Sequence, residues 1–271
     1  SFAQRHLGDV LLSWENEAYL TIAEFGRKLN HVVGFGMGPA VAGAELARFE
    51  EAYHRRGLAA EVDLCPFADP SALTALAKRG YSVNAFSNTY FIDLGIPDRM
   101  ANRIPDRRVR PMRDDEIEET IAASLAGFAA QPNPRSARLL EALARTATQR
   151  EDVEMFVAEV EDRIVGAAAT AVVPTGFGPV AHFFLASTCE DHRGEGIQLG
   201  LMEARLASAR RRGIDLATTT VRPRNASARN AERAGFEQAW RATVPEAVAI
   251  GTSLLHRDYH VDNLMRLPDP A

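Results

Sequence analysis

A glycine-rich turn in the C-terminal half of the chain has the residue types that bind phosphate. Residues 192–200 read His-Arg-Gly-Glu-Gly-Ile-Gln-Leu-Gly, between an apolar run at 181–186 and a helix-patterned segment at 199–212. Glycines let a ligand approach the backbone, and the first turn of a helix has unpaired N–H groups and a partial positive charge. Arg193 adds a guanidinium group. The pattern therefore predicts a site for a phosphate-bearing ligand.

His182 is the candidate for moving a proton beside this turn. It lies in the apolar run, and strand alternation predicts that it shares a face with Phe184 and Ala186. An imidazole that titrates near neutral pH can act as a base or relay a proton through water. The alternative is a half-buried histidine at the start of a strand, with only a packing role.

The composition limits the classes of partner. The 271 residues exceed one average domain and are 46% hydrophobic, enough to bury a sizeable core. A net charge of −5 argues against nucleic acid as the main partner. No apolar run approaches the ~20 residues of a membrane span, and no apolar signal core follows Ser1. Cys65 and Cys189 match no metal spacing. We therefore expect a cytoplasmic protein without a metal site or a membrane or nucleic-acid partner.

The two halves of the chain share a series of landmarks. Each half has a helix closed by glycine, an apolar run, and a shorter helix closed by glycine and an aromatic residue. In the N-terminal half these segments are 40–57, 60–64 and 70–81. In the C-terminal half they are 199–213, 216–221 and 225–236. Because glycine suits the left-handed residue that ends a helix, the series predicts a duplicated α/β unit.

A polar segment with turn residues separates the copies. The expected organisation is a first domain at 1–95, a linker at 96–107, a second domain at 108–250 and a tail at 251–271. The second domain begins with a strand near Val109 and two helices, about 114–128 and 136–146. Three strands follow, and then the segments of the repeat. The predicted order of elements is β-α-α-β-β-β-α-β-α-β.

This order, with the glycine turn between the fourth strand and the third helix, resembles the GCN5-related N-acetyltransferase (GNAT) superfamily over about residues 108–244. The resemblance implies an α/β (α+β) fold of two tandem acyl-CoA N-acyltransferase-like domains. Each would have a mixed, mostly antiparallel sheet flanked by helices, and the first copy would be degenerate. It also implies acetyl-CoA as cosubstrate and direct acetyl transfer to a small-molecule amine.

The resemblance carries over to named residues. The family pattern at the turn is Arg or Gln, any two residues, Gly, any one residue, and then Gly or Ala. Residues 193–198 match this pattern except at Gln198, which is larger than the usual Gly or Ala. The amides that would hold the pyrophosphate belong to Arg193, Gly194, Glu195, Gly196, Ile197 and Gln198. The strand edge that would pair with the pantetheine arm comprises Leu185, Ala186, Ser187 and Thr188. Asn225 matches the polar residue that begins the last helix and contacts this arm.

Two departures from the family pattern affect catalysis and the first copy. Many members place a tyrosine in the last helix as the acid for the leaving thiolate, and Ala231 occupies that position here. In the first copy, Val33 stands where the second copy has Arg193. We therefore expect acetyl-CoA to bind only in the C-terminal domain. The N-terminal copy would cover the acceptor site or form an interface, and a homodimer is an open alternative.

The tail contains a second motif. This motif is His256-Arg257-Asp258, followed after four residues by Asn263. It is similar to the catalytic loop of aminoglycoside and sugar phosphotransferases. By that resemblance, Asp258 would be the base and Asn263 a magnesium ligand. Only 19 residues separate Phe236 from His256, and eight follow Asn263. Neither a nucleotide-binding lobe nor a second metal ligand fits. The tail is therefore expected to be inert, as a truncated fusion or a remnant.

Two further functions compete with the acetyltransferase. A duplicated acetyltransferase fold without turnover could sense acyl-CoA or another small ligand, and the residues at 198 and 231 keep this alternative open. A fragment of a fusion to a small-molecule phosphotransferase is the remote alternative, because its lobes are absent from the sequence.

Overall fold

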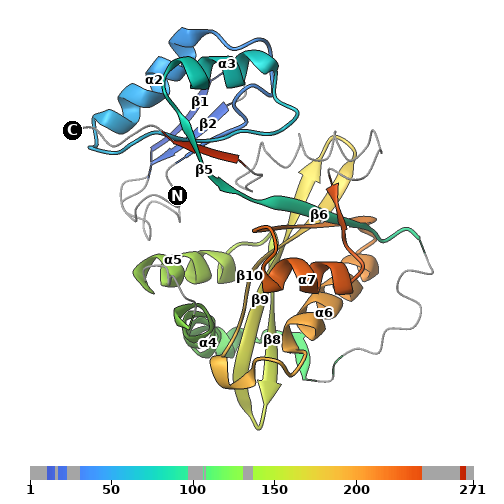
Figure 1. The fold of residues 1–271 in the computed structure, drawn as a ribbon. Coiled ribbons are helices and arrows are strands. Elements are labelled where there is room, and N and C mark those ends of the chain that lie inside the picture. Colours follow the sequence, from blue (N-terminus) through green and yellow to red (C-terminus); the bar gives the residue numbers. More distant parts are fainter. Residues whose placement is uncertain are drawn as a thin grey trace. The chain divides into compact units, whose positions relative to one another are not determined.

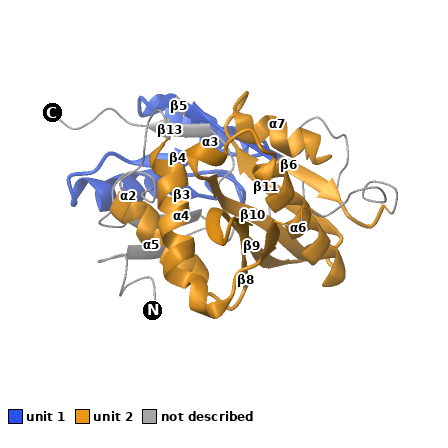
Figure 2. Cartoon of the chain, turned by 90° about the horizontal axis from the view of Figure 1, so that it is seen from below, with its two compact units in different colours: residues 1–89, 239–271 blue, residues 90–238 orange. Residues whose placement is uncertain are grey.

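The structure is a computed structural model that describes residues 11–15, 18–22, 31–96, 106, 108–130, 137–239 and 263–266. The chain divides into two compact units, which are residues 1–89 with 239–271, and residues 90–238 (Figure 2). None of the described helices is long and apolar enough to cross a membrane.

The second unit is built on a seven-stranded sheet in the order β12-β6-β11-β10-β9-β8-β7. The strands are β6 (Asn88–Asp93), β7 (Val109–Pro111), β8 (Val153–Val160), β9 (Arg163–Thr175), β10 (Gly178–Thr188), β11 (Leu216–Val221) and β12 (Glu237–Gln238). Antiparallel pairs join β7 to β8, β8 to β9 and β9 to β10, whereas β10 and β11 run parallel. A two-residue turn with positive φ, Glu161–Asp162, connects β8 to β9, and such turns match the twist of a hairpin.

Helices cover both faces of this sheet. They are α4 (Ile117–Ala129), α5 (Ala137–Thr148), α6 (Ile197–Arg211) and α7 (Ala226–Arg233), with short 3₁₀ turns at Asp114–Glu116 and Glu190–His192. Helices α4 and α5 lie on one face, and α6 and α7 lie on the other (Figure 1). The observed order is β7-α4-α5-β8-β9-β10-α6-β11-α7-β12, which confirms the predicted order of elements and the mixed, mostly antiparallel sheet.

The small residues of β9 let both layers of helices pack closely on the sheet. Residues 166–171 read Gly-Ala-Ala-Ala-Thr-Ala, and all six are buried. Ala168 belongs to the apolar cluster that contains Ile197 and Leu201 of α6, whereas Ala169 belongs to the cluster that contains Ala147 of α5. Because successive strand residues face opposite sides, this run contributes to two cores at once.

The first unit has a six-stranded sheet in the order β1-β2-β3-β4-β13-β5. The strands are β1 (Leu11–Glu15), β2 (Ala18–Ile22), β3 (Val32–Val33), β4 (Glu61–Asp63), β5 (Ser82–Phe86) and β13 (Asn263–Arg266). Its helices are α2 (Gly43–His54) and α3 (Pro70–Lys78). Phe35, Phe49 and Leu76 are among the fully or almost fully buried side chains of the core. Asp69 caps α3 by accepting a hydrogen bond from the Ser71 N–H at 2.9 Å.

Each sheet includes a strand that is remote in sequence from its neighbours. In the first unit, β13 lies between β4 and β5 and is antiparallel to both. In the second unit, β6 lies between β11 and β12, although it follows β5 directly along the chain. The two units therefore exchange strands reciprocally, since the end of the chain completes the first sheet and the end of the first repeat completes the second.

The strand exchange bears on the predicted tail. Residues 256–262 of its motif lie outside the described residues, but Asn263 begins β13 and is in register with Phe86 of β5. The unit boundaries after residues 89 and 238 differ from the predicted boundaries at 95, 107 and 250. The predicted boundaries followed turn residues, whereas the observed division falls within β6 and directly after β12.

Candidate active site

Strands β10 and β11 pair only along their first parts. In the described part of the chain, their register runs from Val180–Leu216 to Phe183–Thr219, although β10 continues to Thr188. In the last pair of this register, the Thr219 hydroxyl donates a hydrogen bond to the Phe183 carbonyl at 3.1 Å. Beyond it, the backbone of β10 has no β11 partner among the described residues. An extended ligand can pair with such an edge as an added strand.

A β-bulge lies where the two strands separate. Phe184 faces Ala169 of β9 and Ser187 faces Ala167, so that two residues of β10 oppose one residue of β9. Leu185, inside the bulge, has a φ of 51°, which is uncommon for a residue other than glycine. A bulge bends its strand and increases the local twist, so it accounts for the separation of β10 from β11. Such backbone strain is concentrated at functional sites.

The bulge also decides which side chains share a face. His182 and Phe184 lie on the same face, with ring centroids 6.5 Å apart. Leu185 packs with the cluster that includes Ala147 of α5, whereas Ala186 packs with the cluster that includes Ile197 of α6. The prediction that Ala186 shares a face with His182 is therefore wrong, because the extra residue of the bulge interrupts the alternation.

His182 is buried, with 4% of its surface exposed. Its Nδ1 lies 3.0 Å from the hydroxyl of Thr218, the residue opposite it on β11, and Thr218 is fully buried. This contact orients the imidazole on the face that α4 and α5 cover. Thr218 was not identified from the sequence, since a threonine in a strand is the ordinary choice for packing.

The glycine turn has the backbone geometry that the sequence predicts. Gly194 and Gly196 have φ values of 86° and 84°, and Gly196 is the N-cap of α6 without a side chain that caps the helix. The first intrahelical hydrogen bond is donated by the Gly200 N–H to Gly196 O at 3.0 Å. The N–H groups of residues 197–199 precede that bond and point out of the helix start, where an anion binds.

Arg108, the residue before β7, holds the glycine turn through contacts with Glu195. Arg108 donates from Nη2 to the Glu195 carbonyl at 2.9 Å and from Nη1 to its carboxylate at 3.2 Å. Arg108 also pairs with Asp106 at 2.8 Å, and its guanidinium group holds the pKa of that carboxyl below the usual range. His192 Nδ1 lies 3.1 Å from the other carboxylate oxygen of Glu195. The side chain of Glu195 therefore stabilises the conformation of the turn.

Arg193 is directed to α4. Its Nη2 donates to Gly127 O at 2.9 Å and its Nη1 to Ala130 O at 3.2 Å. Both carbonyls belong to the C-terminal end of α4, where helix carbonyls lack intrahelical partners. The predicted contact of Arg193 with phosphate stays a prediction, and its visible role is to connect the turn to α4.

The last helix offers a cap but no general acid at the usual position. Asn225 is the N-cap of α7, and its Oδ1 accepts a hydrogen bond from the Ala228 N–H at 2.7 Å. Its side-chain NH₂ group is the part that can contact a cofactor arm. Ala231 is fully buried in the core with Phe236. A tyrosine would not fit there without moving that core, so a proton for the leaving group must come from elsewhere.

The glycine turn of the first unit packs closely against the start of α3. Gly34 and Gly36 also have positive φ values, but a Cβ at Gly36 would lie 2.5 Å from Ala72 Cβ. The Gly36 carbonyl accepts a hydrogen bond from the Asp69 N–H at 2.7 Å. Helix α2 begins only at Gly43, so the turn does not lead directly into a helix. Here glycine is required for packing against α3.

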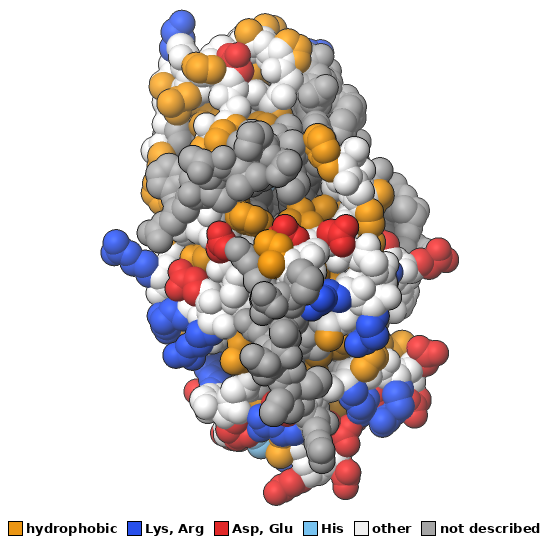
Figure 3. Space-filling model, turned by 90° about the vertical axis from the view of Figure 1, so that its right-hand side faces the viewer, with side chains coloured by type: hydrophobic (Ala, Val, Ile, Leu, Met, Phe, Trp, Pro, Cys, Tyr) orange, Lys and Arg blue, Asp and Glu red, His pale blue; other side chains and the backbone are white. Residues whose placement is uncertain are grey.

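Figure 3 shows described Lys and Arg side chains and described Asp and Glu side chains on the same face. The positive charges relevant to the glycine turn are local ones, Arg108 and Arg193.

Comparisons with known proteins agree with this geometry. Residues 108–239 match a family model described as acetyltransferase (GNAT) domain. No curated protein matches the chain. Similar solved structures include a GCN5-related N-acetyltransferase from Kribbella flavida, with 15% identity over 97% of this chain and 90% of that chain, and a TM-score of 0.57.

Another similar structure is a tandem GNAT protein from the clavulanic acid biosynthesis pathway. It has 13% identity over 100% of this chain and 87% of that chain, with a TM-score of 0.58. A GCN5-related N-acetyltransferase from Sphaerobacter thermophilus has 16% identity over 94% and 82%, with a TM-score of 0.57. These likenesses show the fold along the chain, which is that of tandem GNAT proteins. Residues 108–239 are therefore a domain of the GNAT family, the acyl-CoA-dependent N-acetyltransferases.

Proposed function

We propose that this protein transfers the acetyl group of acetyl-CoA directly to a small-molecule amine. One observation carries the proposal: the open edge of β10 is followed, after a single 3₁₀ turn at Glu190–His192, by the glycine turn and the start of α6. An extended thioester with a pyrophosphate at its other end matches this sequence of an edge for pairing followed by an anion site.

The binding residues are those predicted from the sequence. The amides of residues 193–198 bind the pyrophosphate, and the edge of residues 185–188 pairs with the pantetheine arm. The Asn225 NH₂ group contacts the same arm from α7. Gln198 is half-buried on the first turn of α6, and it contributes its backbone N–H to this site.

The chemistry requires positioning and a path for protons. The amine nitrogen attacks the thioester carbonyl carbon, the C–N bond forms, the C–S bond breaks and the thiolate leaves with a proton. An N–H of β10 near the bulge polarises the carbonyl as charge develops on its oxygen. His182, oriented by Thr218, accepts the proton that the amine loses. Ala231 cannot protonate the thiolate, so that proton comes from water or from the His182 imidazolium.

A binding module without turnover is the second candidate. The observation that favours it is the burial of Ala231, which removes the acid found in many enzymes of the family. A protein of this kind would bind acetyl-CoA at the same turn and release no thiol.

Calorimetry with acetyl-CoA and a thiol-release assay across a panel of small amines separate these functions. We expect wild-type protein to bind acetyl-CoA and to release CoA with at least one amine. In His182→Gln, kcat should fall by about 100-fold or more, the lower range for general base catalysis. The affinity of this variant for acetyl-CoA should stay within about threefold of the wild-type affinity, because the imidazole is proposed to act on the amine and not on acetyl-CoA.

His54→Gln, at an exposed position on α2, is the control and should retain full activity. Binding without thiol release on every amine would favour the binding module. Absence of acetyl-CoA binding by the wild type would refute the assignment of the cofactor site.

A further inference from the structure

The C-terminal end of α4, the end of β10 and the glycine turn meet at one junction. A Cβ at Gly127 of α4 would lie 2.8 Å from Ser187 Cβ and 2.9 Å from the Thr188 N–H nitrogen, so the helix rests directly on the strand backbone. The Ser187 hydroxyl donates to the Ser124 carbonyl of α4 at 3.3 Å. Arg193 connects the glycine turn to this junction through its two hydrogen bonds to the C-terminal end of α4.

The guanidinium group suits this position chemically. The last carbonyls of a helix lack intrahelical partners and carry the negative end of the helix dipole. A planar guanidinium group can donate to two such carbonyls at once, which the ammonium group of lysine does with less geometric definition. The backbone of Arg193 belongs to the proposed pyrophosphate site, so the residue holds α4 with its side chain and the ligand with its main chain.

The position of α4 is relevant to the acceptor. Ala123 of α4 packs with Val157 and Ile164 on the face of the sheet that also carries Phe184, next to His182. A displacement of the C-terminal end of α4 therefore changes the layer through which an amine must reach His182. Among these contacts, the side chain of Arg193 is the one that joins the glycine turn to α4.

We propose that Arg193 is a positioning residue that couples acetyl-CoA binding at the glycine turn to the ordering of the C-terminal end of α4. The inference rests on the proposed function, because it requires acetyl-CoA to bind at the turn. Coupling of this kind is reciprocal: a ligand that orders the turn orders α4, and an ordered α4 raises the affinity of the turn. The cosubstrate thus prepares the acceptor side before the amine arrives.

Hydrogen–deuterium exchange measures the ordering of α4 without knowledge of the acceptor. In the wild type, saturating acetyl-CoA should slow exchange at the amides of residues 124–130 by at least about fivefold, the lower range of allosteric coupling. In Arg193→Ala, acetyl-CoA should still bind, within about tenfold of the wild-type affinity, but this slowing should be lost. Arg193→Lys keeps the charge and should also lose most of the slowing, because it lacks the planar fork.

A second ligand separates positioning from phosphate contact. S-acetylpantetheine lacks the pyrophosphate, so its affinity does not depend on a phosphate ligand. If Arg193→Ala lost about 100-fold or more in affinity for acetyl-CoA and none for S-acetylpantetheine, Arg193 would be a phosphate ligand and the proposal would be overturned. Unchanged slowing of α4 exchange in Arg193→Ala would overturn it as well.

The control is Arg211→Ala, which removes the same charge at the other end of α6, about 20 Å along the helix axis at 1.5 Å per residue. It should bind acetyl-CoA and slow α4 exchange as the wild type does. Failure of the wild type to bind acetyl-CoA would refute the proposed function itself. That outcome is seen in the binding measurement, before any exchange is recorded.

Discussion

Gly127 of α4 and Ser187 of β10 approach so closely that a single added carbon at residue 127 would lie 2.8 Å from Ser187 Cβ. Real side-chain carbons do not approach that closely, so the absence of a side chain at residue 127 sets the distance between the helix and the cofactor strand. The sequence contains no sign of this requirement, because Gly127 lies inside a helical pattern.

Gly127→Ala should therefore destabilise the second unit. Its methyl group must displace α4 or β10, and overpacking of this kind costs about 1–3 kcal/mol. For a unit of this size, the melting temperature should fall by about 2–4 °C for each kcal/mol. Gly176→Ala, where a Cβ meets nothing within 4 Å, is the control and should melt as the wild type does. Equal stability of the two variants would show that α4 does not rest on β10.

Alanine substitutions at Gly194 and Gly196 can separate the effect of backbone strain on stability from the effect on acetyl-CoA binding. Gly194→Ala and Gly196→Ala force alanine to a φ near 85°, and Gly213→Ala does so at 69° after α6. A Cβ at any of the three meets no atom within 4 Å, so each variant should lose a similar stability, of about 1 kcal/mol.

Only the first two variants should lose affinity for acetyl-CoA. A loss of about tenfold, which corresponds to about 1.4 kcal/mol, is expected in calorimetry because the methyl group stands where the ligand approaches the backbone. Gly213→Ala should bind as the wild type does. Equal affinity in all three variants would move the pyrophosphate away from this turn.

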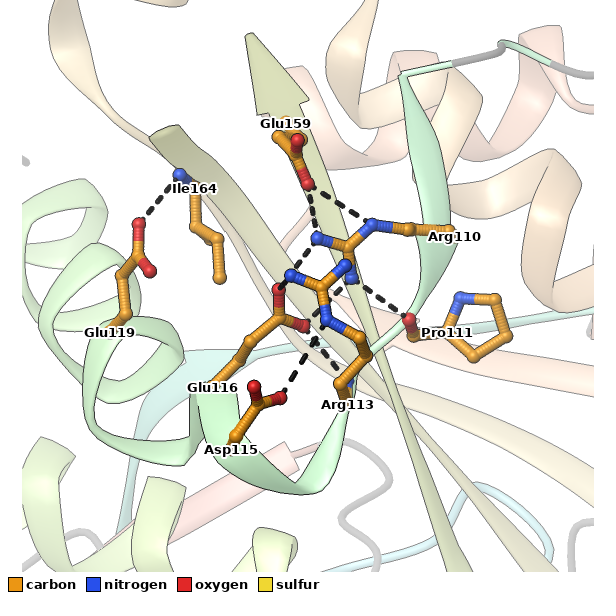
Figure 4. A network of polar contacts seen from close by, with 8 residues as sticks. All are labelled: Arg110, Pro111, Arg113, Asp115, Glu116, Glu119, Glu159 and Ile164. Atoms are coloured by element: carbon orange, nitrogen blue, oxygen red, sulfur yellow. Dashed lines mark hydrogen bonds and ion pairs between the residues drawn. The ribbon is translucent and has the colours of Figure 1, made fainter. Parts of the chain in front are cut away.

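An ion-pair network anchors β7 to β8 and makes the second unit sensitive to acid. Glu116 accepts hydrogen bonds from Arg110 at 2.7 Å and from the Arg113 N–H at 2.9 Å, and Arg110 also pairs with Glu159 (Figure 4). The hydrogen bond from Arg110 is the main reason that the pKa of Glu116 falls from 4.5 to about 2. Because the folded-state pKa is the lower one, stabilisation is present above pH 4.5 and is lost between pH 4.5 and 2.

Glu116→Gln removes this charge at every pH. At pH 6 we expect a loss of about 1–2 kcal/mol in the free energy of unfolding, discounted for the partial exposure of the arginines. The difference from the wild type should shrink as the pH falls from 4.5 to 2. Glu151→Gln, at an exposed position, is the control. A difference that is constant with pH in denaturant titrations would contradict the proposed origin of the stabilisation.

The last described strand should be essential for the first unit. Leu264 is in register with Asp63 of β4 and Ala85 of β5, so β13 supplies hydrogen bonds on both sides. Deletion of residues 263–271 should open two sheet edges and speed hydrogen exchange in β4 and β5. Leu264→Pro should do the same, because proline lacks an N–H and is excluded from central strands.

Deletion of residues 267–271 alone keeps β13 and is the matched control. An unchanged exchange rate in β4 and β5 after the longer deletion would mean that β13 does not hold this sheet together. A remnant of a phosphotransferase loop with no structural role would give that unchanged rate.

Local sequence features predicted much of this fold. The glycines that close helices, at residues 57, 80, 213 and 235, all have positive φ. The change from strand to helix periodicity placed the elements of the second unit, and the glycine turn was predicted with its helix start. These features depend on residues close together in the chain, so they can be read without knowledge of the fold.

Other features depend on partners that are remote in sequence. The bulge at residues 184–187 has leucine at a positive φ, and nothing in its sequence indicates that β10 must leave β11 there. Thr218 became relevant only through its register with His182, and Arg193 only through its contacts with α4. The pairing of β13 with β4 and β5 joins segments that are more than 170 residues apart, and the pairing of β6 with β12 joins segments that are more than 140 residues apart.

The sequence by itself determined that the chain repeats an α/β unit and that the turn at residues 193–198 has the backbone freedom to hold a phosphate, because glycine conformation and helix ends are local properties. Only the tertiary structure decided which unit has an open strand edge beside that turn, which face His182 occupies and what Arg193 holds. Those properties follow from strand register and close packing, and both depend on where distant segments of the chain come together.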